Sequence, residues 1–225
     1  MKLRKTDLFT IIHKAIRSMI YDSASKLQIT DFTNYEESSE ILKMLVKNLE
    51  LLHEHAIHED NIIFPEIAND EPEMIEMLND EHEELEQKLK NILTQIGKLS
   101  DIIEKSERIE NGNDLLKMFN DFAASYLAHM NHEEETVLEA SFKYLSDEEL
   151  IAIRTRIQTQ IPSERYKIWL DWMLGSMNNT ELIGLISGLK TSAPKQILEN
   201  VMDSVRVSIA ESRLETINAQ LELLN

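Results

Sequence analysis

The sequence predicts an all-α protein, an up-down-up-down four-helix bundle followed by a helical C-terminal extension. Three observations lead to this prediction. Glycine and proline are rare, with 5 and 4 among 225 residues, whereas the good helix formers Leu, Ile, Glu, Lys and Met are plentiful. Apolar residues recur at helical spacing over four long segments. The connections between these segments are short and polar, which favours antiparallel neighbours in a bundle.

The first two helices are predicted from their apolar stripes. The first covers residues 6–22, with apolar positions at Phe9, Ile12, Ile16, Met19 and Ile20. A polar stretch over residues 30–39 separates it from the second, whose stripe is Ile41, Leu45, Leu49, Leu52, Ile62 and Ile63. Phe64-Pro65 marks the end of the second helix, because proline disfavours helical geometry at the residue before it.

The third and fourth helices are predicted in the same way. Asp70-Glu71-Pro72 opens the third, since proline is tolerated in a first helical turn. Asn111-Gly112-Asn113 is interpreted as a break between the two helices. The fourth helix is then expected to run from Asp114 to about Tyr144.

A soft boundary near residue 146 divides the chain into a bundle, residues 1–145, and a helical C-terminal extension, residues 146–225. Ser146 and Glu149 have the spacing of a capping box, which predicts a fifth helix. Further breaks are expected at Pro162, Gly175, Asn178-Asn179-Thr180 and Pro194. The last helix is expected to be long, from about Ala193 to Leu224.

Composition excludes several classes of function. The formal net charge is −18, which argues against nucleic acid as a partner because its phosphates would be repelled. The absence of cysteine excludes disulfides, iron–sulfur ligation and thiol catalysis. Charged residues interrupt the apolar run that a signal peptide would need after Lys5, and no segment is long and apolar enough to span a membrane. We therefore expect a soluble, cytoplasmic protein.

The pattern H-x-x-H-E occurs twice, as residues 55–59 and 129–133. Each copy places a histidine and a glutamate four residues apart, so the two side chains share one helix face. The apolar stripes place His55 with Glu59, and His129 with Glu133, on the inward faces of the second and fourth helices.

A single histidine also lies on the inward stripe of the first and third helices, at His13 and His82. An inward histidine by itself is typical of a hydrogen-bonded core residue, and a His/Glu pair is typical of a surface pair. Six polar groups on four inward faces are different, because burying the carboxylates alone would cost several kcal/mol each. The sequence therefore predicts a metal centre with the ligands His13, His55, Glu59, His82, His129 and Glu133.

The remaining histidines and one glutamate are weaker candidates. His53 is expected to point outward. His58 and His132 are expected to face solvent, with a role as hydrogen-bond partners of the ligands as the alternative. Glu86, one turn after His82, is equally compatible with metal ligation and with the surface.

The donor types narrow the choice of metal and of site. Imidazole with carboxylate suits iron, manganese or zinc, and the missing thiolates argue against a structural zinc site. The H-E-x-x-H motif of zincins is absent. The Glu-x-x-His motif that ferritin-like proteins repeat occurs once, ending at His53, which is expected to face away from the site.

Residues 6–145 resemble the hemerythrin-like, or HHE, domain family. The resemblance depends on the lone His13, on His55-x-x-x-Glu59 continuing to Phe64-Pro65, on Glu81-His82-x-x-Leu85 and on His129-x-x-x-Glu133. It implies a non-haem di-iron centre, two iron ions with an oxo or hydroxo bridge, in which the four histidines are terminal ligands. Glu59 and Glu133 would bridge the two ions.

One departure from the oxygen-carrying hemerythrins bears on function. Those proteins have a second histidine one turn away on the third helix, where this chain has Leu78 before His82 and Glu86 after it. With four histidines and two bridging carboxylates, both irons would keep open coordination positions unless Glu86 fills one. Such an open centre suits binding or turnover of O2, NO or peroxide in a stress response. The alternatives are a metal-dependent sensor or adaptor that signals through the C-terminal helices, and iron-centre repair or iron delivery. Repair proteins of the family typically carry a cysteine-containing N-terminal domain, and because this sequence contains no cysteine the repair role is not the expected one.

The C-terminal extension contains both tryptophans, Trp169 and Trp172, and no histidine. It resembles extensions on some bacterial hemerythrin-like proteins. We expect it to pack against the bundle or to form a homodimer surface.

Overall fold

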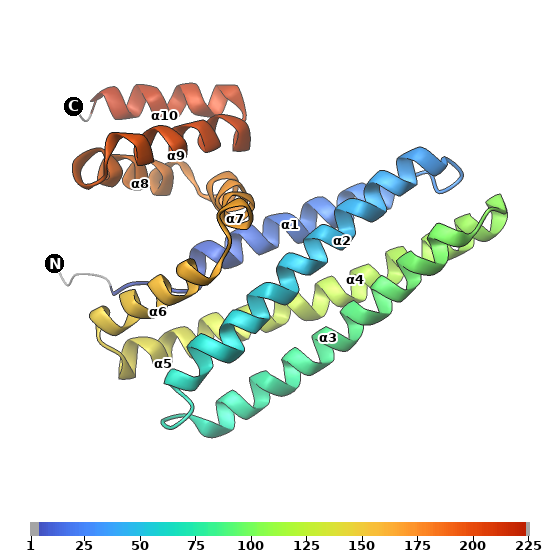
Figure 1. Cartoon of the computed structure of the whole chain (residues 1–225), viewed down its shortest axis with the longest axis horizontal. Coiled ribbons are helices and arrows are strands. Elements are labelled where there is room, and N and C mark those ends of the chain that lie inside the picture. Colours follow the sequence, from blue (N-terminus) through green and yellow to red (C-terminus); the bar gives the residue numbers. More distant parts are fainter. Residues whose placement is uncertain (1–4, 224–225) are drawn as a thin grey trace. The chain divides into compact units, whose positions relative to one another are not determined.

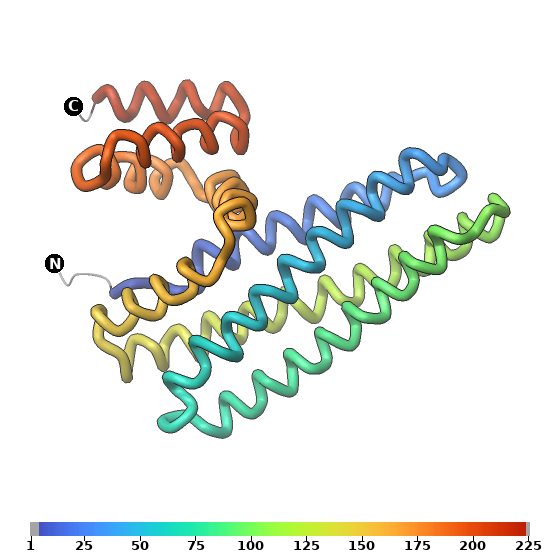
Figure 2. Tube along the Cα trace, in the orientation of Figure 1, coloured from blue at the N-terminus to red at the C-terminus, as the bar shows by residue number. Residues whose placement is uncertain are grey.

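The computed structural model describes residues 5–223, and this range is helical with short connections and without a strand. The predicted all-α class is therefore confirmed. The chain runs alternately up and down through four long helices (Figures 1 and 2). These are α1 (Thr10–Ile29), α2 (Tyr35–His58), α3 (Pro72–Asp101) and α4 (Lys105–Glu135).

The start of α3 follows the predicted signal, whereas α2 ends earlier than predicted. Pro72 occupies the first turn of α3. At its C-terminal end α2 passes into a π-helical turn, η1 (Glu59–Ile63), and then into a 3-10 turn, η2 (Phe64–Glu66), which contains Pro65. The regular α-helix therefore ends at His58, six residues before the predicted end at Phe64-Pro65, and the helical path continues through η1 and η2 to Glu66.

The predicted break at Asn111-Gly112-Asn113 is wrong, because α4 runs through it without interruption. The chain turns earlier, over residues 102–104. Gly112 has a packing role instead: a Cβ atom there would lie 2.2 Å from ring carbon Cδ2 of Phe32. Glycine at this position allows the ring to contact the backbone of α4.

The predicted continuation of the fourth helix to Tyr144 is interrupted at Thr136, after which α5 (Val137–Tyr144) begins. The capping box of Ser146 and Glu149 is confirmed: the Glu149 backbone N–H donates to Ser146 Oγ at 3.2 Å, and the Ser146 backbone N–H donates to Glu149 Oε2 at 2.8 Å. Helix α6 (Asp147–Gln160) follows it. These two helices close one end of the bundle over a shared apolar core. Its buried residues are Phe9, Ile62, Ile63, Phe64, Ile67, Ile75, Leu78, Val137, Ala140, Leu145, Leu150 and Ile153.

The breaks predicted at Pro162, Asn178 and Pro194 are confirmed, whereas Gly175 lies within α7, two residues before the helix gives way to Met177 and Asn178. The helices there are α7 (Ser163–Ser176), α8 (Asn179–Ser192), α9 (Lys195–Ser208) and α10 (Glu211–Leu223). The single long last helix is wrong, because the chain turns at Ile209-Ala210 between α9 and α10. The turn lets both helices bury their apolar faces, with Val205 of α9 and Ile217 of α10 in one core.

By packing, the described chain divides into two compact units. One contains residues 5–9 and 19–157, and the other contains residues 10–18 and 158–223. The division into functional domains at residue 146 stays a prediction. No helix within residues 5–223 is long and apolar enough to cross a membrane.

Candidate metal centre

The six predicted ligand residues are all buried. Their exposed fractions range from 0% for His13 and Glu133 to 8% for His82. Each lies on the apolar stripe of its helix, and the helical period turns that stripe toward the bundle core. The residues come from α1, the end of α2 with η1, α3 and the end of α4.

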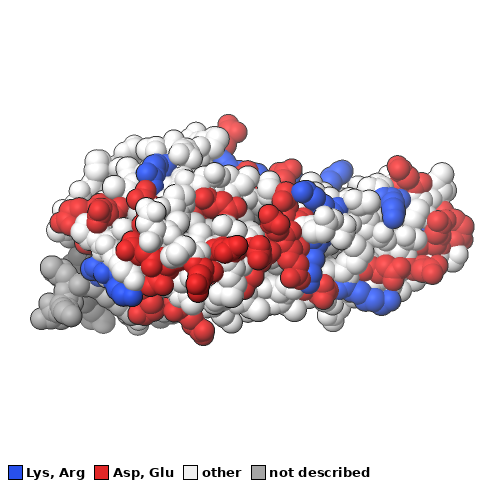
Figure 3. Space-filling model, turned by 90° about the horizontal axis from the view of Figure 1, so that it is seen from below, with Lys and Arg blue, Asp and Glu red and all other residues white. Residues whose placement is uncertain are grey.

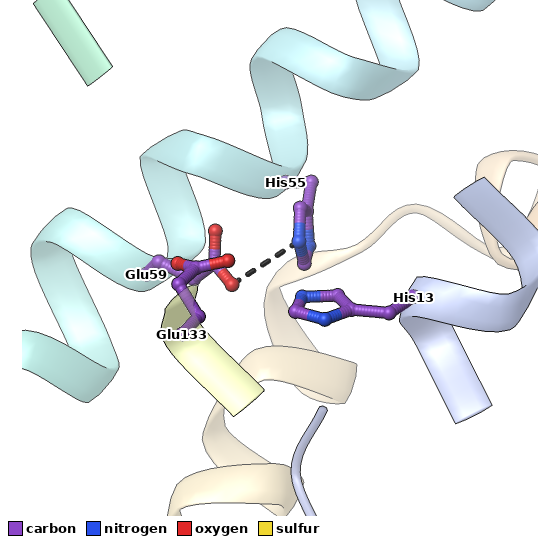
Figure 4. Close-up of side chains that lie close together, drawn as sticks. All are labelled: His13, His55, Glu59 and Glu133. Atoms are coloured by element: carbon purple, nitrogen blue, oxygen red, sulfur yellow. Dashed lines mark ion pairs between the residues drawn. The ribbon is translucent and has the colours of Figure 1, made fainter. Parts of the chain in front are cut away.

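Four of these side chains form one group, shown in Figure 4: His13, His55, Glu59 and Glu133. Each offers a ligand atom, and these atoms all lie within 4.8 Å of one another. His55 Nε2 lies 3.1 Å from Glu59 Oε1, the interaction that the dashed line marks (Figure 4). This is the i,i+4 pair that the sequence pattern predicts.

A second group contains His82, His129 and Glu133, again with ligand atoms within 4.8 Å of one another. His129 Nε2 lies 3.4 Å from Glu133 Oε1. His82 Nε2 lies 3.8 Å from Glu133 Oε1 and 3.8 Å from Glu59 Oε2. Glu133 therefore belongs to both groups, and Glu59 lies within reach of imidazoles from both.

Both carboxylates come from helix ends where the backbone departs from a regular α-helix. Glu59 is the first residue of the π-helical turn η1, and Glu133 lies three residues before the interruption of α4 at Thr136. Single π turns inside helices occur frequently at functional sites. The wider turn also carries Asp60, whose Oδ1 lies 2.6 Å from His82 Nδ1.

Sequence reasoning missed two carboxylates and underrated one histidine. Besides Asp60, Glu81 contacts His129 Nδ1 at 2.7 Å through Oε2. Its other oxygen lies 2.9 Å from Nδ1 of His132, which the sequence assigned to solvent. Asp60 directly follows Glu59 and Glu81 directly precedes His82 in sequence. That adjacency was visible, but the contacts to neighbouring helices were not.

The charges around the imidazoles favour a positive charge at the centre. Burial disfavours a charged His129, but its hydrogen bonds to Glu133 and Glu81 outweigh that effect and raise the pKa to about 9. Burial also opposes the charge on His82, and the hydrogen bond with Asp60 raises its pKa overall. The pKa of Glu81 is lowered, because hydrogen bonds with the two histidines outweigh its partial burial.

Two aromatic rings pack against the imidazoles of the second group. The ring of Phe64 stacks on His82 with centroids 5.4 Å apart, and Tyr126 meets His129 edge-on. The hydroxyl of Tyr126 donates a hydrogen bond of 3.2 Å to the carbonyl of Leu52. Burial, together with the nearby Glu59 and Glu133, raises the pKa of Tyr126 well above its usual value, so the phenol stays neutral.

The remaining candidates lie outside both groups. His53 is exposed, as predicted, and His58 is half-buried with a pKa lowered by burial and by His55. The carboxylate of Glu86 pairs with Lys90 at 2.8 Å and its side chain is 41% exposed. Leu78, one turn before His82, is fully buried in the apolar core.

The donor set matches a bound cation. Buried imidazole nitrogens and carboxylate oxygens converge without any thiolate, which suits iron, manganese or zinc. The imidazoles of His82 and His129 each place Nε2 toward shared carboxylates while Nδ1 contacts another carboxylate. Metal-binding histidines in proteins have this arrangement.

Comparison with known proteins agrees with this chemistry. The family described as "Hemerythrin HHE cation binding domain" matches residues 4–141, more than half of the chain. F-box/LRR-repeat protein 5 of Danio rerio is 24% identical over 157 residues. That match covers 69% of this chain and 22% of the relative, so the chain spans about a fifth of that protein's length.

Proposed function

The chain belongs to the hemerythrin HHE cation-binding domain family, and we propose that it holds a non-haem di-iron centre that binds or reacts with O2, NO or peroxide. The observation that carries the proposal is the burial of Glu59 and Glu133 between two groups of imidazoles. Two carboxylates removed from water need positive charge close by, and cations supply it. We also propose a cytoplasmic location, because a chain without cysteine forms no disulfides and so has no need of an oxidising compartment.

In this proposal each ion has its own pair of histidines. His13 and His55 would hold one ion, His82 and His129 would hold the other, and the carboxylates between the groups would serve both. Glu133 is suited to that shared role because it belongs to both groups. Bound iron supplies open coordination positions and one-electron chemistry toward O2, NO or peroxide.

A small pocket beside His82 supports a ligand of diatomic size. Its volume is about 20 Å³, close to the space that one water molecule needs, so it excludes bulky substrates. Most of its lining is apolar, which suits O2 and NO better than a charged ligand. The lining residues are Leu52, His53, Ala56, His82, Leu85, Glu86, Leu89, Phe122 and Tyr126.

The test is anaerobic loading with ferrous iron, followed by separate exposure to O2, NO and peroxide with an optical readout. We expect about two ions per chain, as in two-metal sites, and a spectral change with at least one of the three reagents. The His55→Ala and His82→Ala variants each remove a donor from one group and should each retain less iron. Iron uptake well below one ion per chain in the wild-type protein would contradict the proposal.

A second candidate function is a metal-dependent sensor or adaptor. Helices α7–α10 bury an apolar core of their own, and the F-box/LRR-repeat relative matches only over 22% of its length, so the region shared with this chain is part of a larger protein there. In this alternative the C-terminal helices would contact a protein partner or a second copy of the chain. Deleting residues 158–225 separates the candidates. Unchanged iron loading and reactivity, with loss of a metal-dependent oligomer or complex, would favour the sensor.

A further inference from the structure

Two carboxylates outside the proposed ligand set hold two of the proposed ligands. Asp60 Oδ1 lies 2.6 Å from His82 Nδ1, and Glu81 Oε2 lies 2.7 Å from His129 Nδ1. We propose that Asp60 and Glu81 are positioning residues that fix the direction in which these imidazoles present Nε2. We also propose that His132 keeps Glu81 in place. The inference rests on the proposed function, because it assigns these residues a role toward the same centre.

The chemistry of the contact fixes which nitrogen faces the centre. An ionised carboxylate only accepts hydrogen bonds, so Nδ1 of each ring must carry a proton and donate it. The lone pair of the neutral ring is then on Nε2. In both rings Nε2 faces the shared carboxylates, 3.4 Å from Glu133 Oε1 for His129 and 3.8 Å for His82. The outer carboxylate therefore selects the ring form that can bind a cation.

The positioning contacts link neighbouring helices. Asp60, in η1, holds an imidazole of α3, and Glu81, in α3, holds an imidazole of α4. Asp60 directly follows the proposed ligand Glu59, and Glu81 directly precedes the proposed ligand His82. Each of these elements thus presents a ligand and, at the adjacent position, the carboxylate that orients the ligand of the next helix. The directions of the ligands from η1 through α4 are therefore interdependent.

Glu81 is held at both of its oxygens. Oε2 contacts His129 and Oε1 contacts Nδ1 of His132 at 2.9 Å. The side chains of Glu81 and His132 are 33% and 27% exposed, so water can compete for either bond alone. Two bonds from neighbouring positions on α4 restrict the carboxylate to one orientation, which a single bond would not do.

Replacing Glu81 with Leu or Gln separates loss of the contact from loss of charge. Glu81→Leu removes both hydrogen bonds while keeping a side chain of similar size. Glu81→Gln keeps one oxygen that can accept from His129, and its amide group can donate to His132 if that ring changes tautomer. His132→Gln keeps the Glu81 side chain but removes the imidazole that contacts Glu81 Oε1. Glu83→Leu changes an exposed glutamate on the same helix and is the matched control.

The measurement is Co²⁺ affinity under anaerobic conditions by competition with a chelator, together with the visible spectrum of bound Co²⁺. We expect Glu81→Leu to weaken Co²⁺ binding about 10- to 100-fold and to alter the spectrum. Glu81→Gln should recover most of the affinity, and His132→Gln should weaken binding to an intermediate degree. Asp60→Ala should weaken binding in the same range, with partial recovery in Asp60→Asn. Glu83→Leu should match wild type.

Thermal unfolding of each metal-free variant distinguishes positioning from folding. Wild-type affinity and spectrum in Glu81→Leu would overturn the inference for Glu81, and the same result in Asp60→Ala would overturn it for Asp60. If Glu81→Leu does not fold, wild-type affinity in His132→Gln would overturn the role of the Glu81 anchor. Failure of the wild-type protein itself to bind Co²⁺ or iron would contradict the proposed function instead, so the two failures are distinguishable.

Discussion

His129 lies between two carboxylates, with Glu133 on the side of the proposed centre and Glu81 on the outer side. Its pKa of about 9 means that in the metal-free protein the ring carries a proton on both nitrogens at neutral pH. That proton occupies Nε2, the atom that we propose as a ligand. Proton and metal ion therefore compete for the same nitrogen, and each compensates the same buried negative charge.

Metal affinity and the stability of the metal-free protein should consequently respond to pH in opposite directions. Binding displaces the His129 proton, so the apparent affinity for Co²⁺ should rise about tenfold per pH unit between pH 7 and 9. The folded-state pKa is raised above the unfolded value of 6.5. Its stabilisation of the metal-free protein is therefore fully present below pH 6.5 and lost as pH rises through about 9. Chelator competition and urea unfolding at a series of pH values measure the two trends.

The variant His129→Asn serves as the control for the stability trend, because it lacks the titrating ring. In this variant the decline in urea midpoint between pH 6.5 and 9 should become shallower. An unchanged slope would show that other groups dominate the pH dependence, and would contradict the assignment to His129.

Glu133 is the carboxylate common to both groups of donors. Changing it to Gln keeps the shape of the side chain but removes the charge that both proposed ions share. Glu133→Gln should therefore reduce bound iron from about two ions per chain to less than one, as metal analysis would show. Glu135→Gln, an exposed carboxylate near the end of α4, should keep the wild-type content. Equal iron content in the two variants would exclude a shared role for Glu133.

For individual residues, the sequence predicts which side chains of a helix face the core. The positions of His13, His55, His82 and His129 relative to their apolar stripes were enough to predict that all four are buried. The contacts of Asp60 and Glu81 could not be predicted from the sequence, because their partners lie on the next helix and the pairing depends on how the helices are aligned. The role of these residues as metal ligands or partners stays a prediction until metal is measured.

Among the elements, α4 shows how packing overrides local preference. Asn and Gly around position 112 favour a turn, yet the helix continues. The reason lies outside the segment. The buried Arg108 donates hydrogen bonds of 2.7 to 2.8 Å to the carbonyls of Phe32 and Leu99 and to Ser38 Oγ. These bonds fix the first turns of α4 against neighbouring segments of the same chain. Helix ends with strong local signals, at Pro72 and Ser146, were predictable, whereas this end depends on contacts distant in sequence.

The packing role of Gly112 can be tested with an alanine pair. Gly112→Ala would place Cβ 2.2 to 2.6 Å from carbons of the Phe32 ring, so the ring must move. We expect a loss of about 1–3 kcal/mol in the free energy of unfolding, despite alanine's higher helix propensity. Urea unfolding followed by circular dichroism measures the change. Metal content should stay at the wild-type level, because neither proposed group contains these residues.

Gly97→Ala is the matched control, since no heavy atom lies within 4 Å of a Cβ added there on α3. This change should raise the free energy of unfolding by up to about 1 kcal/mol through helix propensity alone. Stabilisation of similar size in Gly112→Ala would show that Gly112 only lowers the helix propensity of α4. That result would contradict the packing role.

For the whole molecule, the dominant property is its charge. The formal net charge is −18, and acidic side chains spread across the face that Figure 3 shows, with basic ones interspersed. Such a charge opposes close approach between copies of the protein in solution. It also produces a negative potential around a protein whose family binds cations, so that divalent ions are attracted before they reach any ligand.

This attraction should appear as a salt-dependent rate of metal uptake. The Debye length falls from about 30 Å at 0.01 M salt to about 10 Å at 0.1 M, so added salt screens the field of distant charges. Association of Co²⁺ with the metal-free protein, followed by stopped-flow absorbance, should be at least about tenfold faster at 0.01 M than at 0.5 M potassium chloride. The reaction of the iron-loaded protein with NO provides the control, because NO is neutral and its rate should be nearly independent of salt. If Co²⁺ uptake is as insensitive to salt as NO, the surface charge serves solubility alone and uptake is limited by opening of the buried site.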